Sequence, residues 1–74
     1  LAKYLLQLAN ASGKPLAEGI SFSLNESQQE IASHIGTVRE IVSRTLHKFQ
    51  DQDLIRLKGR RLTILDREGL EELL

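Results

Sequence analysis

The chain contains no cysteine, no methionine and no tryptophan, and it has a single proline. Without cysteine it can form neither a disulfide framework nor a thiolate-bound metal site. No segment approaches the roughly 20 consecutive apolar residues of a membrane-spanning helix, and no signal-peptide pattern opens the chain. We therefore expect a cytoplasmic domain that does not contact a membrane.

Residue types that usually carry catalysis or metal binding are sparse. The glycines stand singly along the chain, which excludes a glycine-rich phosphate-binding loop. His34 and His47 have no convincing third metal ligand nearby in the sequence, and no acidic residue accompanies them as a catalytic triad would need. We therefore expect no metal, no cofactor and no enzymatic activity in this domain.

The length of 74 residues fits one small domain with a modest core. The chain begins at Leu1 and lacks methionine, so we expect it to be a fragment of a longer protein, with residues 1–74 forming a single domain.

Charge is balanced overall but unevenly distributed. Residues 37–61 hold seven basic and three acidic side chains, a difference of +4. The other residues hold three basic and seven acidic side chains, a difference of −4. A basic centre between acidic ends fits a surface that faces phosphate, although an ordinary solvated surface has the same composition.

The middle of the sequence has the spacing of a helix-turn-helix. Ile31, Ala32 and Ile35 fall on one face of a short helix, and the small Ala32 lets a second helix cross close to it. Gly36 suits the turn because it can adopt a positive φ. Apolar residues then repeat at i, i+4, i+8 and i+11 along a second helix, which we place at about residues 38–50. This stripe consists of Val38, Val42, Leu46 and Phe49.

Two capping boxes indicate where these helices begin. Ser27 and Glu30 match the first box, in which each side chain accepts a hydrogen bond from the backbone amide of the other residue. Thr37 and Glu40 match the second. Glu40 is therefore a candidate for capping the start of the second helix, and this does not exclude a second role in binding.

The side of the second helix opposite the stripe is polar. It carries Arg39, Glu40, Ser43, Arg44 and His47. Helix-turn-helix proteins place this helix in the major groove of DNA, so such a face would contact base edges. The alternative is a winged helix that binds another protein. A protein-binding surface should carry apolar or aromatic anchors, which the residues at 39, 40, 43 and 44 do not provide.

The flanking segments predict an α+β fold, a winged helix-turn-helix. An amino-terminal helix is followed by a loop over residues 13–19 and a short strand from Ile20 to Leu24. Two further strand candidates flank a turn at Lys58, Gly59 and Arg60, which makes a β-hairpin wing with a basic tip. Lysine and arginine at such a tip suit phosphate contact, although surface hairpins also carry them for solubility. The amino-terminal stripe consists of Leu1, Tyr4, Leu5 and Leu8, and a last helix capped by Asp66 contains Leu70, Leu73 and Leu74.

Over essentially its whole length the chain resembles the carboxy-terminal DNA-binding domain of the Crp–Fnr family of transcription regulators. The resemblance is strongest over residues 29–32, 36–44 and 54–59. In that family the positions matching Glu40 and Arg44 recognise bases of a TGA-containing half-site. The position matching Arg39 recognises a further base in the cyclic-AMP receptor branch, and that matching Ser43 does so in the fumarate and nitrate branch. All four residues occur here, so the branch stays open.

The resemblance also implies the partners. We expect binding to double-stranded DNA and a homodimer formed through a region upstream of Leu1, where the family carries its effector-binding and dimerisation regions. RNA polymerase is a further candidate partner. Val38 stands where many members have a hydroxyl residue that meets phosphate, which leaves Thr37 as the substitute. The residues expected to contact phosphate are Ser27, Gln29, Thr37, Lys58 and Arg60.

Overall fold

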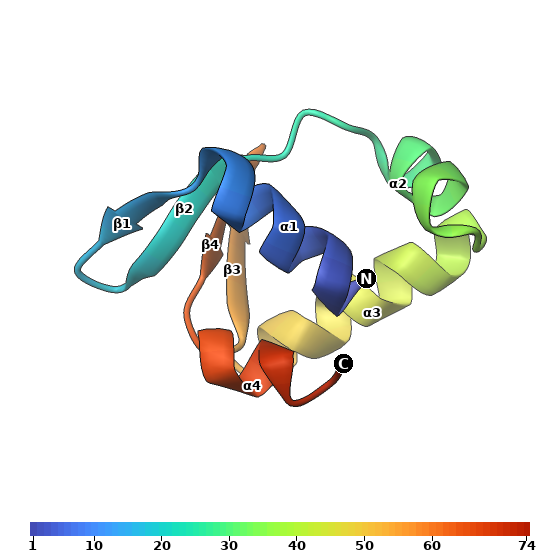
Figure 1. Ribbon diagram of the computed structural model, residues 1–74. Helices are drawn as coiled ribbons and strands as arrows, with labels where there is room; N and C mark the ends of the chain where they lie inside the picture. The colour runs from blue at the N-terminus through green and yellow to red at the C-terminus, as the bar shows by residue number, and fades with distance from the viewer.

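The structure is a computed structural model that describes all 74 residues. Figure 1 shows α1 lying over the strands and α4 at their lower end, while α3 extends away from the sheet to α2. No helix is long and apolar enough to cross a bilayer. In chain order the elements are α1 (Ala2–Ser12), β1 (Lys14–Leu16), β2 (Gly19–Ser23), α2 (Gln28–Ile35), α3 (Arg39–Asp51), β3 (Ile55–Lys58), β4 (Arg61–Ile64) and α4 (Arg67–Glu71).

The four strands form one antiparallel sheet in the order β1-β2-β4-β3. β3 and β4 make the expected hairpin wing, in which Lys58 lies opposite Arg61. β2 joins the wing to the rest of the sheet by placing Ile20 opposite Ile64 and Phe22 opposite Leu62. The predicted α+β winged helix-turn-helix is confirmed.

The prediction of a loop over residues 13–19 is wrong in part. Lys14–Leu16 forms β1, which pairs with β2 so that Lys14 lies opposite Ser21. Local pattern does not reveal this strand, because all three of its residues are exposed and Pro15 lacks an amide hydrogen. Proline is tolerated here because β1 is an edge strand with only one hydrogen-bonded neighbour.

All four helices and the sheet contribute to one hydrophobic core. Leu5 of α1, Ile31 of α2, Leu46 of α3, Leu62 of β4 and Leu70 of α4 are at most 2% exposed. Every helix also carries exposed positions, so its amphipathic pattern determines which side faces inward. The core holds the helix-turn-helix against the sheet.

The two terminal stripes behave differently from one another. The amino-terminal stripe does pack on the core, but α1 also buries Ala2, Leu6 and Ala9, whose small or flexible side chains allow close contact. In the carboxy-terminal stripe only Leu70 is buried. Leu73 and Leu74 are 54% and 70% exposed, because α4 ends at Glu71 before the chain could bring them back onto the core. The expectation that they lie in the last helix is wrong, whereas the predicted cap by Asp66 is confirmed, because its side chain accepts from the Gly69 amide.

Candidate nucleic-acid interface

The first helix of the motif begins with the predicted capping box at Ser27. The Ser27 hydroxyl oxygen accepts from the Glu30 amide at 3.1 Å, and the Glu30 carboxylate accepts from the Ser27 amide at 3.0 Å. The hydrogen bond from the Ser27 backbone is the main reason that the pKa of Glu30 lies below its ordinary value. This box fixes the direction in which the chain enters α2.

The turn between the two helices has the expected backbone. Gly36 adopts φ 75° and ψ 40°, the left-handed conformation that ends α2. The amides of Gly36 and Thr37 both donate to the Ala32 carbonyl, so the turn satisfies the end of the helix. α2 then packs on α3 through Ile31 and Ala32, which are completely buried. The helix-turn-helix is thus present where the spacing predicts it.

The predicted capping box at Thr37 is not formed. α3 begins at Arg39, its N-cap is Val38, and no side chain caps it. A capping box needs the glutamate three residues after the N-cap, whereas Glu40 stands only two after Val38. The Glu40 carboxylate is therefore not held by a box.

Val38 is also not part of the buried stripe. It has an extended backbone and is 55% exposed, while Val42, Leu46 and Phe49 are buried as expected. The positive φ of Gly36 delays the start of α3, which leaves Val38 outside the helix. The observed helix, Arg39–Asp51, nevertheless agrees with the predicted range of 38–50 within one residue.

The four residues expected to contact bases lie on the first two turns of α3. Arg39, Glu40 and Arg44 are exposed, and Ser43 is half-buried. Residues four apart on a helix are neighbours, so Glu40 lies beside Arg44 and Arg39 beside Ser43. No side-chain hydrogen bond or ion pair within the domain uses any of the four. Their polar groups are therefore not engaged within the domain.

The same end of α3 also exposes apolar side chains. Ile41 is 45% exposed and Val38 is 55% exposed. Our sequence prediction treated this face as wholly polar and missed Ile41. Adjacent residues of a helix are rotated by about 100°, so Ile41 cannot lie on the same face as its buried neighbour Val42. This spacing was the signal that Ile41 would be exposed.

The wing tip lies beside the start of α2. Gly59 has φ 61° at the turn, and Lys58 and Arg60 on either side of it are exposed. A hollow of about 370 Å³ is lined by Ser27 from the entry to α2 and by Arg60 from the wing, among others. The fold thus brings together two of the residues expected to contact phosphate.

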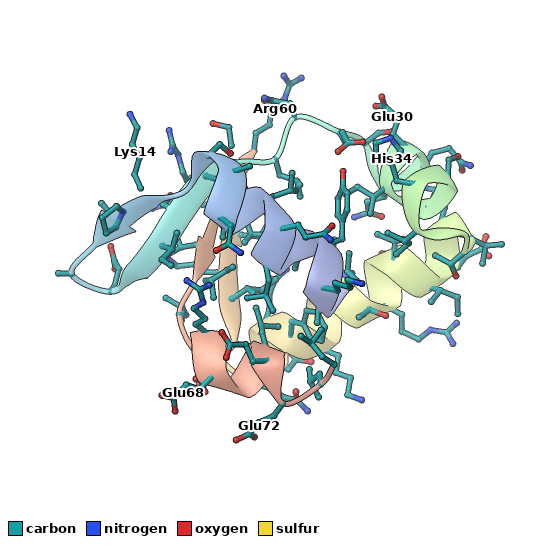
Figure 2. The ribbon with its side chains drawn as sticks, viewed as in Figure 1. Lys14, Glu30, His34, Arg60, Glu68 and Glu72 are labelled. Atoms are coloured by element: carbon teal, nitrogen blue, oxygen red, sulfur yellow. The ribbon has the colours of Figure 1, made fainter.

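The other expected phosphate contacts do not line this hollow. Gln29 is exposed on the first turn of α2, Thr37 is half-buried in the turn before α3, and Lys58 precedes the wing tip. Figure 2 shows Lys14 and Arg60 pointing to the same side of the molecule, while Glu68 of α4 and Glu72 just after it lie on the opposite side. Glu30 also points to the side of Arg60, so the charge separation found in the sequence is only partly a separation in space.

His34 has an acidic partner, Glu26, which the sequence analysis did not predict. Its Nδ1 atom lies 3.0 Å from a carboxylate oxygen of Glu26, and the Tyr4 hydroxyl donates to the same carboxylate. The Tyr4 ring also meets the imidazole edge-on, with 5.8 Å between ring centroids. These contacts connect α1 with α2 and the loop before it. No group of three or more potential metal ligands occurs in the domain.

The sequence matches the model of one protein family, described as the Crp-like helix-turn-helix domain, over residues 1–73. The chain belongs to this family. Its members are DNA-binding transcription regulators, so the helix-turn-helix and wing described above are the DNA-binding unit of such a regulator.

Individual relatives agree with this assignment. The chain is 37% identical over 70 residues to a CRP-like cAMP-activated global transcriptional regulator of Mycobacterium tuberculosis, covering 95% of this chain and 31% of the relative. It is 39% identical over 62 residues to the transcriptional activator protein Anr of Pseudomonas protegens, covering 80% and 25%. Among solved structures, the CO-dependent transcription factor CooA from Carboxydothermus hydrogenoformans superposes with a TM-score of 0.85 at 33% identity, covering 96% and 33%. The chain spans a third or less of the length of these relatives.

Proposed function

We propose that residues 1–74 form the domain through which a Crp–Fnr-type regulator recognises its operator, with α3 in the major groove of a TGA-containing half-site. The observation that carries this proposal is the exposed and internally unpaired set Arg39, Glu40 and Arg44 on the first turns of α3. Two other arginines are engaged internally, since Arg56 pairs with Glu18 and Arg67 with Glu71.

Each proposed base contact follows from hydrogen-bonding capacity. The Arg44 guanidinium can donate two hydrogen bonds to O6 and N7 of a guanine, and the Glu40 carboxylate can accept from N4 of a cytosine. Because the two residues are one helical turn apart, they can address the same or adjacent base pairs. Arg39 and Ser43 form a second such pair beside them, and which of these two contributes decides the branch of the family.

The residues around the hollow are proposed to position the helix on the phosphate backbone. The Ser27 hydroxyl accepts from the Glu30 amide but keeps its own proton for donation to phosphate. Gln29 and Thr37 extend this contact along α2 and the turn, and Lys58 and Arg60 extend it along the wing. Such contacts determine register and strengthen binding without selecting sequence.

One domain accounts for one half-site. Recognition of a palindrome therefore requires two copies about one helical turn of DNA apart, and we infer a homodimer held by a region outside residues 1–74. Effector binding is assigned to that region as well, and we propose no cofactor for this domain. Contact with RNA polymerase stays a proposal to which we assign no residue.

Selection of bound sequences from random duplex DNA tests the proposal. The full-length regulator should enrich a symmetrical consensus with TGA in each half, and its Arg44→Ala variant should lose the preference at the matching base pair. Absence of any enrichment by the unaltered protein would contradict the proposal.

A specific observation keeps the protein-binding alternative open, namely the exposed Val38 and Ile41 at the start of α3. Apolar side chains at this place could anchor a protein partner. They could equally contact thymine methyl groups in the major groove. If Val38 and Ile41 contact bases, removal of the thymine methyl groups should weaken DNA binding, whereas a protein-binding role predicts no such effect.

A further inference from the structure

Three side chains connect α1 with the first helix of the helix-turn-helix. The Tyr4 hydroxyl of α1 donates to one carboxylate oxygen of Glu26 and lies 3.2 Å from the Nδ1 atom of His34. The same Nδ1 atom lies 3.0 Å from the other carboxylate oxygen of Glu26. We call Tyr4, Glu26 and His34 the α1–α2 clamp.

The α1–α2 clamp holds both ends of α2. Glu26 comes one residue before Ser27, the N-cap of this helix, and His34 lies on its last turn. Elsewhere α1 packs on α4 and β2, whereas α2 packs on α3. No other side-chain hydrogen bond or ion pair joins α2 or α3 to another element. The clamp is therefore the polar connection between the helix-turn-helix and α1.

The position of Glu26 bears on the proposed DNA contacts. Glu26 directly precedes Ser27, which begins α2 and is proposed to contact phosphate. Two residues before Glu26, the Leu24 amide donates to the Arg60 carbonyl of the wing. The loop before α2 is thus tied to the wing by its backbone and to α1 by the side chain of Glu26. Loss of the second connection would free the start of α2 to shift relative to the wing.

His34 makes the strength of the α1–α2 clamp depend on pH. Histidine is the side chain that ordinarily changes its charge between about pH 5 and 8. A neutral imidazole can donate from Nδ1 to the carboxylate, and protonation turns this contact into an ion pair with a stronger, charge-assisted hydrogen bond. The side chain of His34 is 61% exposed, so it exchanges protons with solvent, whereas that of Glu26 is only 26% exposed.

The charged groups around His34 are mostly acidic. Glu26 faces it from the loop, and Glu30 lies one helical turn before it on α2 (Figure 2). Lys3 of α1 lines the same hollow of about 380 Å³ as Tyr4 and His34 but forms no ion pair. No side chain of α3 pairs with His34. A positive charge on His34 therefore meets two carboxylates and one ammonium group, and it is attracted to Glu26.

We propose that Glu26 is a positioning residue for operator binding and that protonation of His34 strengthens the α1–α2 clamp, so that operator affinity rises as pH falls through the histidine range. The inference rests on the proposed function, because it concerns how α2 is presented to the same DNA. Above that range the neutral clamp still forms, but its contribution to affinity is smaller.

The test measures the affinity of the full-length regulator for its selected palindrome between about pH 5.5 and 8 at constant ionic strength. The gain in affinity on acidification should be about two- to fivefold larger for the unaltered protein than for His34→Gln, the range that a partly exposed ion pair contributes. Glu26→Gln should lose the same part of the gain, because a neutral amide does not attract the imidazolium.

A permanent charge should replace the proton. His34→Arg is charged throughout this range, so it should bind the palindrome more tightly than His34→Gln at about pH 8 and should lack the gain on acidification that His34 provides. Adding Glu26→Gln to His34→Arg should remove the tighter binding, because the arginine then has no carboxylate partner in the clamp.

Control variants separate the α1–α2 clamp from other effects of charge. His47→Gln removes the other histidine of the domain, which is exposed on α3, and the difference between His34 and His34→Gln should persist in this background. Lys3→Ala removes an exposed lysine of α1 beside the clamp and should leave the gain on acidification unchanged. Thermal melting of each variant at both ends of the pH range checks that the fold is intact.

The outcomes distinguish this inference from the function on which it rests. If the unaltered regulator does not bind the palindrome at any pH, the proposed function fails. If it binds with the same pH dependence as His34→Gln, the proposed function stands and the inference is overturned. If Glu26→Gln keeps the gain that His34→Gln loses, the charge of His34 acts on DNA without the clamp, which also overturns it. Should the glutamine variants not fold, His34→Arg decides, since binding at about pH 8 no tighter than that of the unaltered protein would contradict the inference.

Discussion

The Arg60 carbonyl at the wing tip accepts a hydrogen bond of 2.6 Å from the backbone amide of Leu24, at the point where β2 leads into the loop before α2. This bond connects the wing to the segment that delivers Ser27. The tip of the wing and the start of α2 are therefore held in one arrangement, although more than 30 residues of sequence separate them. The surface proposed to contact phosphate is therefore joined by a hydrogen bond within the domain itself.

Arg44→Ala should reduce affinity for the preferred operator by roughly 1 to 3 kcal/mol and affect random DNA far less. The reason is the loss of two hydrogen bonds to one guanine. Titrations of both DNAs followed by fluorescence anisotropy measure the difference. Lys48→Ala, on the later part of the same helix, is the matched control and should not change the ratio of the two affinities. Equal losses on both DNAs for Arg44→Ala would indicate a phosphate contact instead.

Val38 and Ile41 should contribute specificity through thymine methyl groups. Replacing individual thymines of the half-site by uracil removes the methyl and keeps every hydrogen bond, so affinity should fall at one or two positions. Ile41→Ala should weaken binding to the thymine duplex and make it insensitive to that replacement. If uracil is tolerated at every position, the exposed apolar pair does not contact the bases, and the protein-binding alternative gains support.

Lys58→Ala should weaken binding to all sequences alike and lower the salt slope by about one, because one phosphate contact and its released counterion are lost. Affinities measured over a range of salt concentrations on specific and random duplexes provide the slope. The matched control is again Lys3→Ala, which should leave both slopes unchanged. A changed base preference with an unchanged slope would mean that the wing contacts bases.

Gly36→Val should lower the free energy of unfolding by about 1 to 3 kcal/mol, which in a domain of this size is a fall in melting temperature of roughly 4 °C or more. The cause is the positive φ of Gly36, since a β-carbon there would meet no other atom within 4 Å. Gly36→Asn is the matched control, because asparagine tolerates this conformation better, and it should cost clearly less. Equal losses for both variants would show that strain at φ is not the reason.

The capping box at Glu30 should make stability depend on pH in acid. Because its pKa is lowered in the folded state, the carboxylate stabilises the domain fully above its ordinary value of 4.5, and this contribution is lost as pH falls through the lowered pKa. Glu30→Ala should reduce stability at neutral pH and flatten the acid limb of the profile. Chemical unfolding at several pH values measures both effects, and an unchanged acid limb would contradict the prediction.

Much of this domain follows from local sequence alone. The Ser27 and Glu30 box, the glycine turn and the stripe of Val42, Leu46 and Phe49 involve residues within a few positions of each other. Their hydrogen bonds and helical spacing therefore do not depend on the rest of the chain. The same holds for the turn at Gly59, so the helix-turn-helix, the wing and the candidate base contacts were all predictable.

Other features exist only because distant segments meet. The start of α3 at Arg39, rather than at Val38, follows from how the chain leaves the left-handed turn and packs α3 on α2, and this leaves Glu40 outside its capping box. β1 is a strand only because β2 offers it an edge, since its own residues have little strand character. The cationic row from Lys14 to Arg56 joins residues 42 positions apart through three strand pairings. The sequence by itself determined the side chains and the local elements that they form. Only the register of the sheet decided that the unpaired hydroxyl of Ser21 lies among Lys14, Arg56, Lys58 and Arg61. The reason is that register depends on backbone hydrogen bonds between segments that are far apart in the sequence.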